Sequence, residues 1–185
     1  MKEESDVQMS DAQKESNELM PFMDTFYSLA SNDLKERSFA ASSMMSYLFL
    51  RKDYDIESTI KDGNYALTRL LNGLCSGRAS ARQGFASCLA TFLRLSAKMG
   101  PENGKTWIEM MASAAKDSND CSLYVRKTLK ECTNYEGGAK DKKGGKSRSD
   151  QREFRFGRLF GILAIVRSGT LDQASEKVRI NCTCF

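Results

Sequence analysis

Apolar residues recur along most of the chain at intervals of three and four, the spacing of one face of an α-helix. The clearest stripe repeats at i, i+4, i+7, i+8, i+11 and i+14 and consists of Ala81, Phe85, Cys88, Leu89, Phe92 and Leu95. It predicts a helix that begins near Ser80 and ends before Gly100 and Pro101. No segment alternates apolar and polar residues for long enough to predict a strand. The pattern therefore predicts an all-α fold.

The same spacing predicts seven further helices along the chain. We expect them at residues 21–30, 33–48, 64–77, 105–116, 120–134 and 152–171, and from residue 171 onward. Asp33 is the expected N-cap of the second of these, with Glu36 in the capping-box position. The polar residues before position 64 are expected to form a connection. Most connections are short, which predicts antiparallel neighbours.

Consecutive helix pairs of this length are typical of armadillo or HEAT units, whose period is about 40 residues. We therefore predict an antiparallel armadillo/HEAT-like helix array, with a compact helical bundle as the alternative. The expected organisation is an acidic disordered tail at 1–19, a helical repeat region at 20–135, a basic Gly/Lys/Ser linker at 136–150, and a continuation of the array at 151–185 that stops within a helix.

The helix predicted at 152–171 has two different faces. One carries large apolar residues, namely Phe156, Leu159, Phe160, Leu163 and Val166. The other is a helix-packing face of small residues at i, i+4, i+7 and i+11, namely Gly157, Gly161, Ala164 and Ser168. A glycine inside a helix costs about 1 kcal/mol relative to alanine, which close packing must offset. We therefore expect this helix to be buried on two sides and Gly161→Leu to be destabilising. The apolar run is too short to cross a membrane.

Charge is distributed unevenly around a net value of +4. Residues 1–18 carry six acids against two lysines, a net −4, whereas residues 136–152 carry six basic side chains against three acids, a net +3. Lysine and arginine bind nucleic acid by neutralising phosphates. The candidate nucleic-acid contacts are Lys140, Lys142, Lys143, Lys146, Arg148, Arg152, Arg155 and Arg158. The alternative is that this tract is a soluble linker or a nuclear-import signal.

Catalytic constellations are hard to find in the sequence. The chain has no histidine, which excludes every mechanism that depends on one. Asp53 and Asp55 lie in a predicted polar connection, and no motif gathers the acids that a two-metal site needs. The six cysteines do not form a disulfide framework, and the pair Cys182 and Cys184 has no second pair at zinc spacing. We predict no catalytic residue, no metal and no cofactor, although catalysis by lysine or cysteine stays open.

Three blocks of the sequence carry a family resemblance, at residues 26–48, 65–93 and 153–171. Their characteristic patterns are YAL-x-RL-x-x-GL-x-S-x-R-x-x-AR-x-GF, which begins at Tyr65, and FGRLFG-x-x-A-x-x-x-SG, which begins at Phe156. In their order and spacing these blocks resemble the N-terminal region of the DNA polymerase V / Myb-binding protein 1A family. Family members are several times longer, so this chain is expected to be a fragment, a truncated gene product or a splice variant.

The resemblance implies an armadillo-like scaffold in the nucleolus, within the nucleus. It implies a non-enzymatic role in rRNA gene transcription and ribosome biogenesis. The implied partners are DNA or chromatin at the rDNA and transcription factors or ribosome-biogenesis proteins, with no membrane and no small-molecule substrate. The alternative is the activity in the family's name, a DNA-directed DNA polymerase or another nucleic-acid enzyme.

Overall fold

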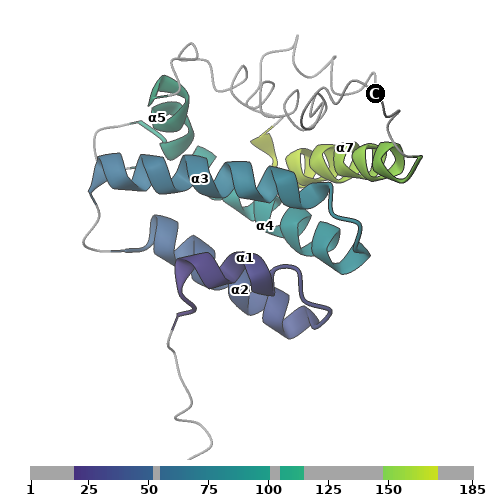
Figure 1. The fold of residues 1–185 in the computed structure, drawn as a ribbon. Coiled ribbons are helices and arrows are strands. Elements are labelled where there is room, and N and C mark those ends of the chain that lie inside the picture. Colours follow the sequence, from purple (N-terminus) through teal and green to yellow (C-terminus); the bar gives the residue numbers. More distant parts are fainter. Residues whose placement is uncertain (1–18, 52–54, 101–104, 115–147, 171–185) are drawn as a thin grey trace, which may run out of the picture.

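The computed structural model describes residues 19–51, 55–100, 105–114 and 148–170, and within these ranges every element is an α-helix (Figure 1). The helices are α1 (Phe22–Ser28), α2 (Leu34–Phe49), α3 (Ile56–Leu74), α4 (Ala79–Lys98), α5 (Trp107–Ala114) and α7 (Arg148–Ser168). The prediction of an all-α fold is confirmed. The helices expected at 120–134 and from 171 onward, and the tail at 1–18, lie outside the described residues.

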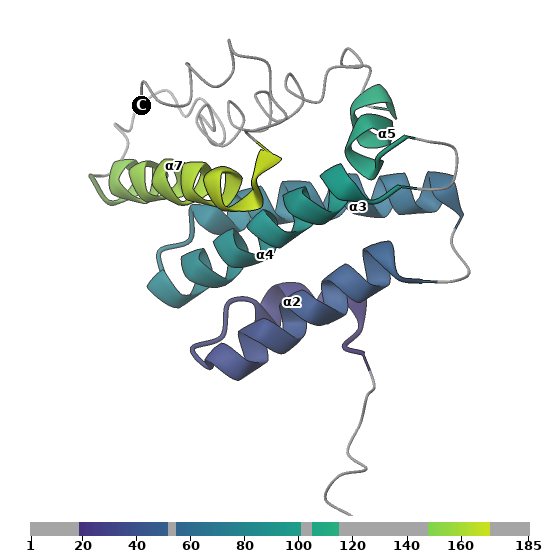
Figure 2. The same ribbon diagram turned by 180° about the vertical axis from the view of Figure 1, so that it is seen from behind.

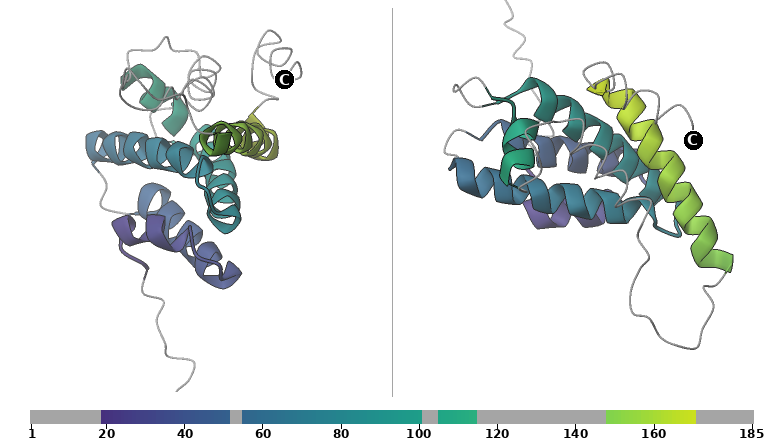
Figure 3. Two further views of the ribbon diagram at one scale, coloured as in Figure 1. Left: turned by 45° about the vertical axis from the view of Figure 1, so that its right-hand side comes forward. Right: turned by 90° about the horizontal axis from the view of Figure 1, so that it is seen from above.

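Helix α4 is the centre of the arrangement, because it packs against α2, α3, α5 and α7. Helices α1 and α2 form one hairpin, and α3 and α4 form a second (Figure 1). The α1–α2 hairpin covers one side of α3 and α4, whereas α5 and α7 lie on the other side (Figure 3). Figure 2 shows α4 between α2 and α7 when the molecule is seen from behind. Helix α7, which begins at Arg148, thus meets helices that end at Lys98 or earlier in the chain.

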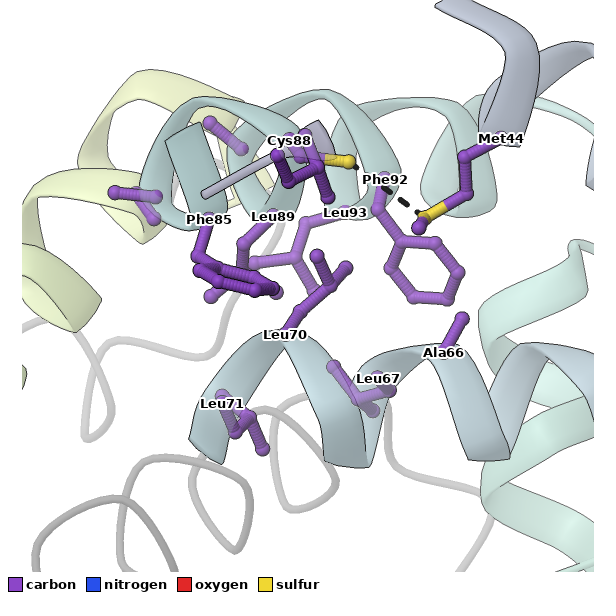
Figure 4. Close-up of a cluster of buried hydrophobic side chains, with 14 of the residues drawn as sticks. Met44, Ala66, Leu67, Leu70, Leu71, Phe85, Cys88, Leu89, Phe92 and Leu93 are labelled. Atoms are coloured by element: carbon purple, nitrogen blue, oxygen red, sulfur yellow. Dashed lines mark hydrogen bonds between the residues drawn. The ribbon is translucent and has the colours of Figure 1, made fainter. Parts of the chain in front are cut away.

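The core lies between α3 and α4 and is closed by α2 (Figure 4). The largest apolar side chains that are fully buried are Phe92, Leu29, Met44, Leu70, Leu74, Leu89 and Leu93. Each stabilises the fold by about 1.5–3 kcal/mol relative to an exposed position. Cys88 lies among them, with its Sγ 3.7 Å from the Sδ of Met44. The stripe that predicts the central helix is therefore the stripe that faces this core.

Helix α2 begins with the predicted cap but without the predicted capping box. Oδ1 of Asp33 accepts a hydrogen bond from the backbone N–H of Lys35 at 2.9 Å. The carboxylate of Glu36 turns instead to the α1–α2 connection, where Ser28 Oγ donates to it at 2.8 Å. Hydrogen bonds from Ser31 and Ser28 lower the pKa of Glu36. Glu36 thus ties the two helices of the first hairpin together.

Helix α3 begins at Ile56, so the prediction of a polar connection up to residue 64 is wrong. Asp55 caps the helix, because its Oδ2 accepts hydrogen bonds from the backbone N–H and the hydroxyl of Ser58, both at 2.9 Å. The first two turns bury Thr59 and Gly63 rather than large apolar residues. A Cβ at Gly63 would lie 2.8 Å from the Sδ of Met111 on α5. The apolar pattern misses these turns because their buried side chains are small or polar.

Helix α5 packs against α3 and α4 through Trp107 and Met111, which are both buried. Its first turn is fixed by a reciprocal capping box. The backbone N–H of Thr106 donates to Glu109 Oε2 at 2.7 Å, and the N–H of Glu109 donates to the Thr106 hydroxyl at 3.4 Å. None of the helices in the described ranges combines the length and the apolar character needed to cross a bilayer.

Candidate functional site

The predicted nucleic-acid residues fall in and before α7. Lys140, Lys142, Lys143 and Lys146 lie outside the described residues. Arg148 is the first residue of α7, and its side chain is not among those described. Arg152, Arg155 and Arg158 are exposed on the first half of the helix. The structure thus places three of the eight candidates, as a row at three-residue spacing that we call the arginine row.

The acidic residue between the first two arginines of this row faces the turn between α3 and α4. Glu153 is half-buried and lies beside the turn between α3 and α4, where a Cβ at Gly77 would be 3.0 Å from its Oε1. Its charge, together with the larger effect of burial, raises the pKa of the Cys75 thiol in the same turn. Glu153 is therefore turned toward the fold and away from the exposed arginines.

The two glycines of the small-residue face of α7 pack on the end of α3 and the turn that follows it. A Cβ at Gly157 would lie 2.6 Å from Cys75 Sγ, and one at Gly161 would lie 3.5 Å from Leu74 Cδ1. Ala164 and Ser168 are also buried. The Ser168 hydroxyl donates to the backbone carbonyl of Ile165 at 2.7 Å, so its burial leaves its proton satisfied.

The opposite face of α7 is exposed, so the expectation that this helix is buried on two sides is wrong. Leu159 is 62% exposed, Leu163 is 40% exposed and Val166 is 56% exposed. Phe156 and Phe160 are half-buried at the border between the two faces. The reason is that α7 contacts α3 and α4 from one side only.

Arg82 joins α4 to α7 and was not singled out from the sequence. It is 9% exposed, and its Nη1 donates to the backbone carbonyl of Ser76 at 2.6 Å. Its guanidinium lies 4.7 Å from the ring centroid of Phe156 and 5.9 Å from that of Phe160. Such contacts with aromatic faces contribute up to about 2 kcal/mol where water is excluded. The signal was a basic residue within the apolar stripe of α4 together with two phenylalanines four residues apart.

The two sequence patterns behind the family resemblance therefore meet in space. Gly157 lies against Cys75, and Arg82 lies against Phe156 and Phe160. Within the first pattern, the ring of Phe85 occupies the space that a side chain at Gly73 would need. We call this contact region the α4–α7 junction. Its residues pack together, stack on aromatic rings and donate a hydrogen bond to the Ser76 carbonyl, so the junction holds α4 and α7 together.

Several groups that could perform chemistry cap helices or are buried in the described part of the chain. No three His, Cys, Asp or Glu side chains come together there as metal ligands would. Asp55 caps a helix, and Asp53 lies outside the described residues. Burial raises the pKa of the Cys88 thiol to about 12, which is the reverse of nucleophile activation. Cys182 and Cys184 lie outside the described residues.

A family model described as DNA polymerase phi matches residues 65–183, which include the whole α4–α7 junction. The chain belongs to the DNA polymerase phi family. This confirms the resemblance found in the sequence. The protein named rDNA transcriptional regulator POL5 of Saccharomyces cerevisiae is 32% identical over 154 residues, and that named rDNA transcriptional regulator pol5 of Schizosaccharomyces pombe is 30% identical over 156 residues. No solved structure was found to match the chain.

Both relatives are named rDNA transcriptional regulators. The similarity covers 83% and 84% of this chain but only 14% and 12% of the two relatives. The chain therefore spans a small part of the length of the relatives that it matches.

Proposed function

We propose that this chain is a non-catalytic helical module that acts in the regulation of rDNA transcription in the nucleolus and contacts nucleic acid through α7 and the lysines before it. The observation that carries the proposal is the similarity to two proteins named rDNA transcriptional regulators over more than four fifths of the chain. The proposed partners are rDNA chromatin and the transcription or ribosome-biogenesis proteins bound to it.

The nucleic-acid part of the proposal is supported by the arginine row. Arg152, Arg155 and Arg158 are all exposed, and they span about 9 Å of helix at the usual rise per residue. Glu153 faces the α3–α4 turn, so it does not interrupt their exposed side. Phosphate contacts of this kind give affinity without sequence preference and depend strongly on salt. The predicted lysines at 140, 142, 143 and 146 extend the same charge toward the N-terminus.

The non-catalytic part is supported by how the reactive groups are used. Asp55 and Glu109 cap helices, and the thiols of Cys75 and Cys88 have raised pKa values. Helix capping does not supply ligands for a pair of metal ions, and a thiol with a raised pKa is not an activated nucleophile. The activity in the family's name is tested by primer extension with the full chain. Metal-dependent nucleotide incorporation that a carboxylate substitution abolishes would establish a polymerase instead.

Binding to nucleic acid is tested by fluorescence anisotropy of a labelled rDNA duplex against the full chain at several salt concentrations. Changing Arg152, Arg155 and Arg158 to glutamine is expected to weaken binding and to reduce the slope of log K against log salt by up to about 3. The control is the change of Arg94 and Lys98 to glutamine, which removes two exposed charges from the end of α4, so the losses are compared per charge removed. Equal losses in the two variants would assign binding to overall charge and remove the arginine row from the proposal.

The role in transcription is tested in cells that express the chain. Its depletion is expected to lower the labelling of newly made pre-rRNA, and the unaltered chain is expected to restore it. Rescue by the arginine-row variant should be incomplete, whereas the Arg94 and Lys98 variant should rescue fully. Unchanged pre-rRNA synthesis after depletion, or a tagged chain that is excluded from the nucleolus, would contradict the proposal.

A further inference from the structure

A groove of about 710 Å³ lies between α2, α4 and α7. We call it the α2–α4–α7 groove. Its apolar lining comes from all three helices and includes Ala41, Met45, Gly84, Ala86, Phe160 and Leu163. The backbone at Gly84 approaches the carbonyl of Leu29, so no side chain can fill the groove from that position. The groove exists because the hairpin α1–α2 and helix α7 approach α4 from different sides.

Large apolar side chains at the edge of this groove are left in solvent. Leu34 is 66% exposed at the edge formed by α2, and Leu163 is 40% exposed at the edge formed by α7. Leu159 and Val166 on α7 are also exposed, but neither of them lines the groove. Contiguous apolar surface of this kind, rimmed by polar residues, is typical of a protein interaction site.

The polar residues that line the groove are small or uncharged, apart from two arginines. Ser38 and Ser42 come from α2, and Ser87 and Thr91 come from α4. The charged lining residues are Arg37 and Arg167, and no carboxylate is among the lining residues of the described chain. Nη1 of Arg37 is held by the backbone carbonyls of Ser31 and Asn32 at 2.8 and 2.9 Å, which orient the guanidinium without neutralising its charge.

We propose that the α2–α4–α7 groove binds an amphipathic helix of a partner protein that carries acidic residues beside its apolar face. Side chains at i, i+3 or i+4, and i+7 of such a helix enter an apolar groove between helices. Small lining residues let its backbone come close, and its carboxylates pair with Arg37 and Arg167. The charge of the groove selects an acidic partner over a basic one.

Other occupants fit the groove less well. The chain's own acidic segment, residues 1–18, has a net −4 but offers only Met1, Val7, Met9 and Ala12 as apolar residues, without helical spacing of large side chains. A second copy of this chain has a net charge of +4 and brings more positive charge to a positive groove. Nucleic acid would leave the apolar lining without a counterpart. The arginine row and the groove use different side chains of α7, so this inference does not depend on the proposed function.

The groove is tested with a fluorescent synthetic helix that has leucines at i, i+3, i+4 and i+7 and glutamates at both ends, titrated with the full chain. We expect Leu163→Ser to weaken binding about tenfold, because the leucine loses its apolar contact. The matched control is Leu159→Ser on the same helix, which does not line the groove and should change binding less than twofold. Arg167→Gln should weaken binding about threefold at low salt and have no effect at high salt.

Several outcomes would overturn the inference. These are equal binding of a peptide with the same composition but scrambled leucines, tighter binding when lysines replace the glutamates, and equal losses for Leu159→Ser and Leu163→Ser. Displacement of the helix by a peptide of residues 1–18, by duplex DNA or by a second copy of the chain would assign the groove to that occupant instead. Ser87→Trp provides a second variant that fills the groove from an exposed position and should block binding while helicity by circular dichroism stays unchanged.

Discussion

The two faces of α7 differ in a way that hydrophobicity alone does not explain. The inner face consists of Gly157, Gly161, Ala164 and Ser168 and is buried, whereas the outer face bears Leu159, Leu163 and Val166 and is exposed. A leucine stabilises the fold more than a glycine when it is buried. Here α7 lies close to the end of α3, and only small residues allow the two backbones to approach each other so closely. The larger residues are consequently left for another surface.

The largest expected loss of stability comes from placing a large side chain on the inner face. Gly157→Leu is expected to destabilise the protein by at least about 2 kcal/mol, because even a Cβ at this position would lie 2.6 Å from Cys75 Sγ. Urea denaturation followed by circular dichroism measures the change. An unaltered midpoint would mean that α7 does not lie against the α3–α4 turn.

The next largest effect concerns the residue that joins the inner face to α4. Arg82→Ala is expected to cost about 2 kcal/mol, since it removes both the stacking on Phe156 and Phe160 and the hydrogen bond to Ser76 O. Arg82→Lys should recover only part of this, because an ammonium lacks the planar fork. Arg94→Ala, at an exposed position on the same helix, is the control and should change the free energy of unfolding by less than about 0.5 kcal/mol.

The two glycines of the inner face are distinguished by alanine. Gly157→Ala should destabilise the protein by about 1 kcal/mol, because the clash exceeds the gain in helix propensity. Gly161→Ala should be neutral or stabilise by up to about 1 kcal/mol, since its Cβ would make an ordinary contact with Leu74 at 3.5 Å. The same urea experiment compares them. The opposite order would show that α7 sits on α3 in a different register.

Truncating a leucine on the outer face is expected to have little effect on stability. Leu159→Ala is expected to change the free energy of unfolding by less than about 0.5 kcal/mol, because the side chain is already 62% exposed. Thermal or urea denaturation is sufficient for the measurement. A loss near 2 kcal/mol, as for a core leucine, would place this face against another part of the chain.

The smallest expected effect is a pH dependence at the inner face. Burial, and to a lesser degree Glu153, raise the pKa of the Cys75 thiol above its ordinary value of 9.0. The thiol of the unfolded chain therefore loses its proton first, and stability that is fully present below pH 9.0 declines as the pH rises through the native value. Cys75→Ser should reduce this decline. In mass spectrometry at pH 8, alkylation of Cys75 should be slower than that of a free thiol, and Glu153→Gln should accelerate it.

Much of this fold could be predicted from the sequence because large apolar side chains mark the core side of α2 and α4. The first half of α3 could not, since its buried positions are Thr59 and Gly63, which carry no apolar signal. Its start was nonetheless encoded in the Asp55 cap. Pattern reading therefore fails where a helix packs through small or polar residues.

The candidate sites also include features that one stretch of sequence reveals and features that form only when several helices come together. The positive charge around Arg152, Arg155 and Arg158 is visible in the sequence, and so are the small residues of α7. The stacking of Arg82 on Phe156 joins two residues on different helices that are 74 positions apart in the chain, since 156 − 82 = 74. The α2–α4–α7 groove depends on three helices at once. Exposure of Leu159 and Leu163 could not be predicted, because periodicity reveals that a face is apolar but not whether anything covers it.

The central position of α4 has a consequence for synthesis on the ribosome. Helix α4 is complete at Lys98, but α7, which covers one of its sides, ends only at Ser168. At usual translation speeds this interval lasts roughly 4–14 s. During that time Arg82 and the α3–α4 turn lack their contacts with α7, and the nascent chain offers an apolar surface to chaperones. Substitutions at the α4–α7 junction should therefore reduce the yield of folded protein in cells even where they lower the melting temperature of the purified chain only slightly.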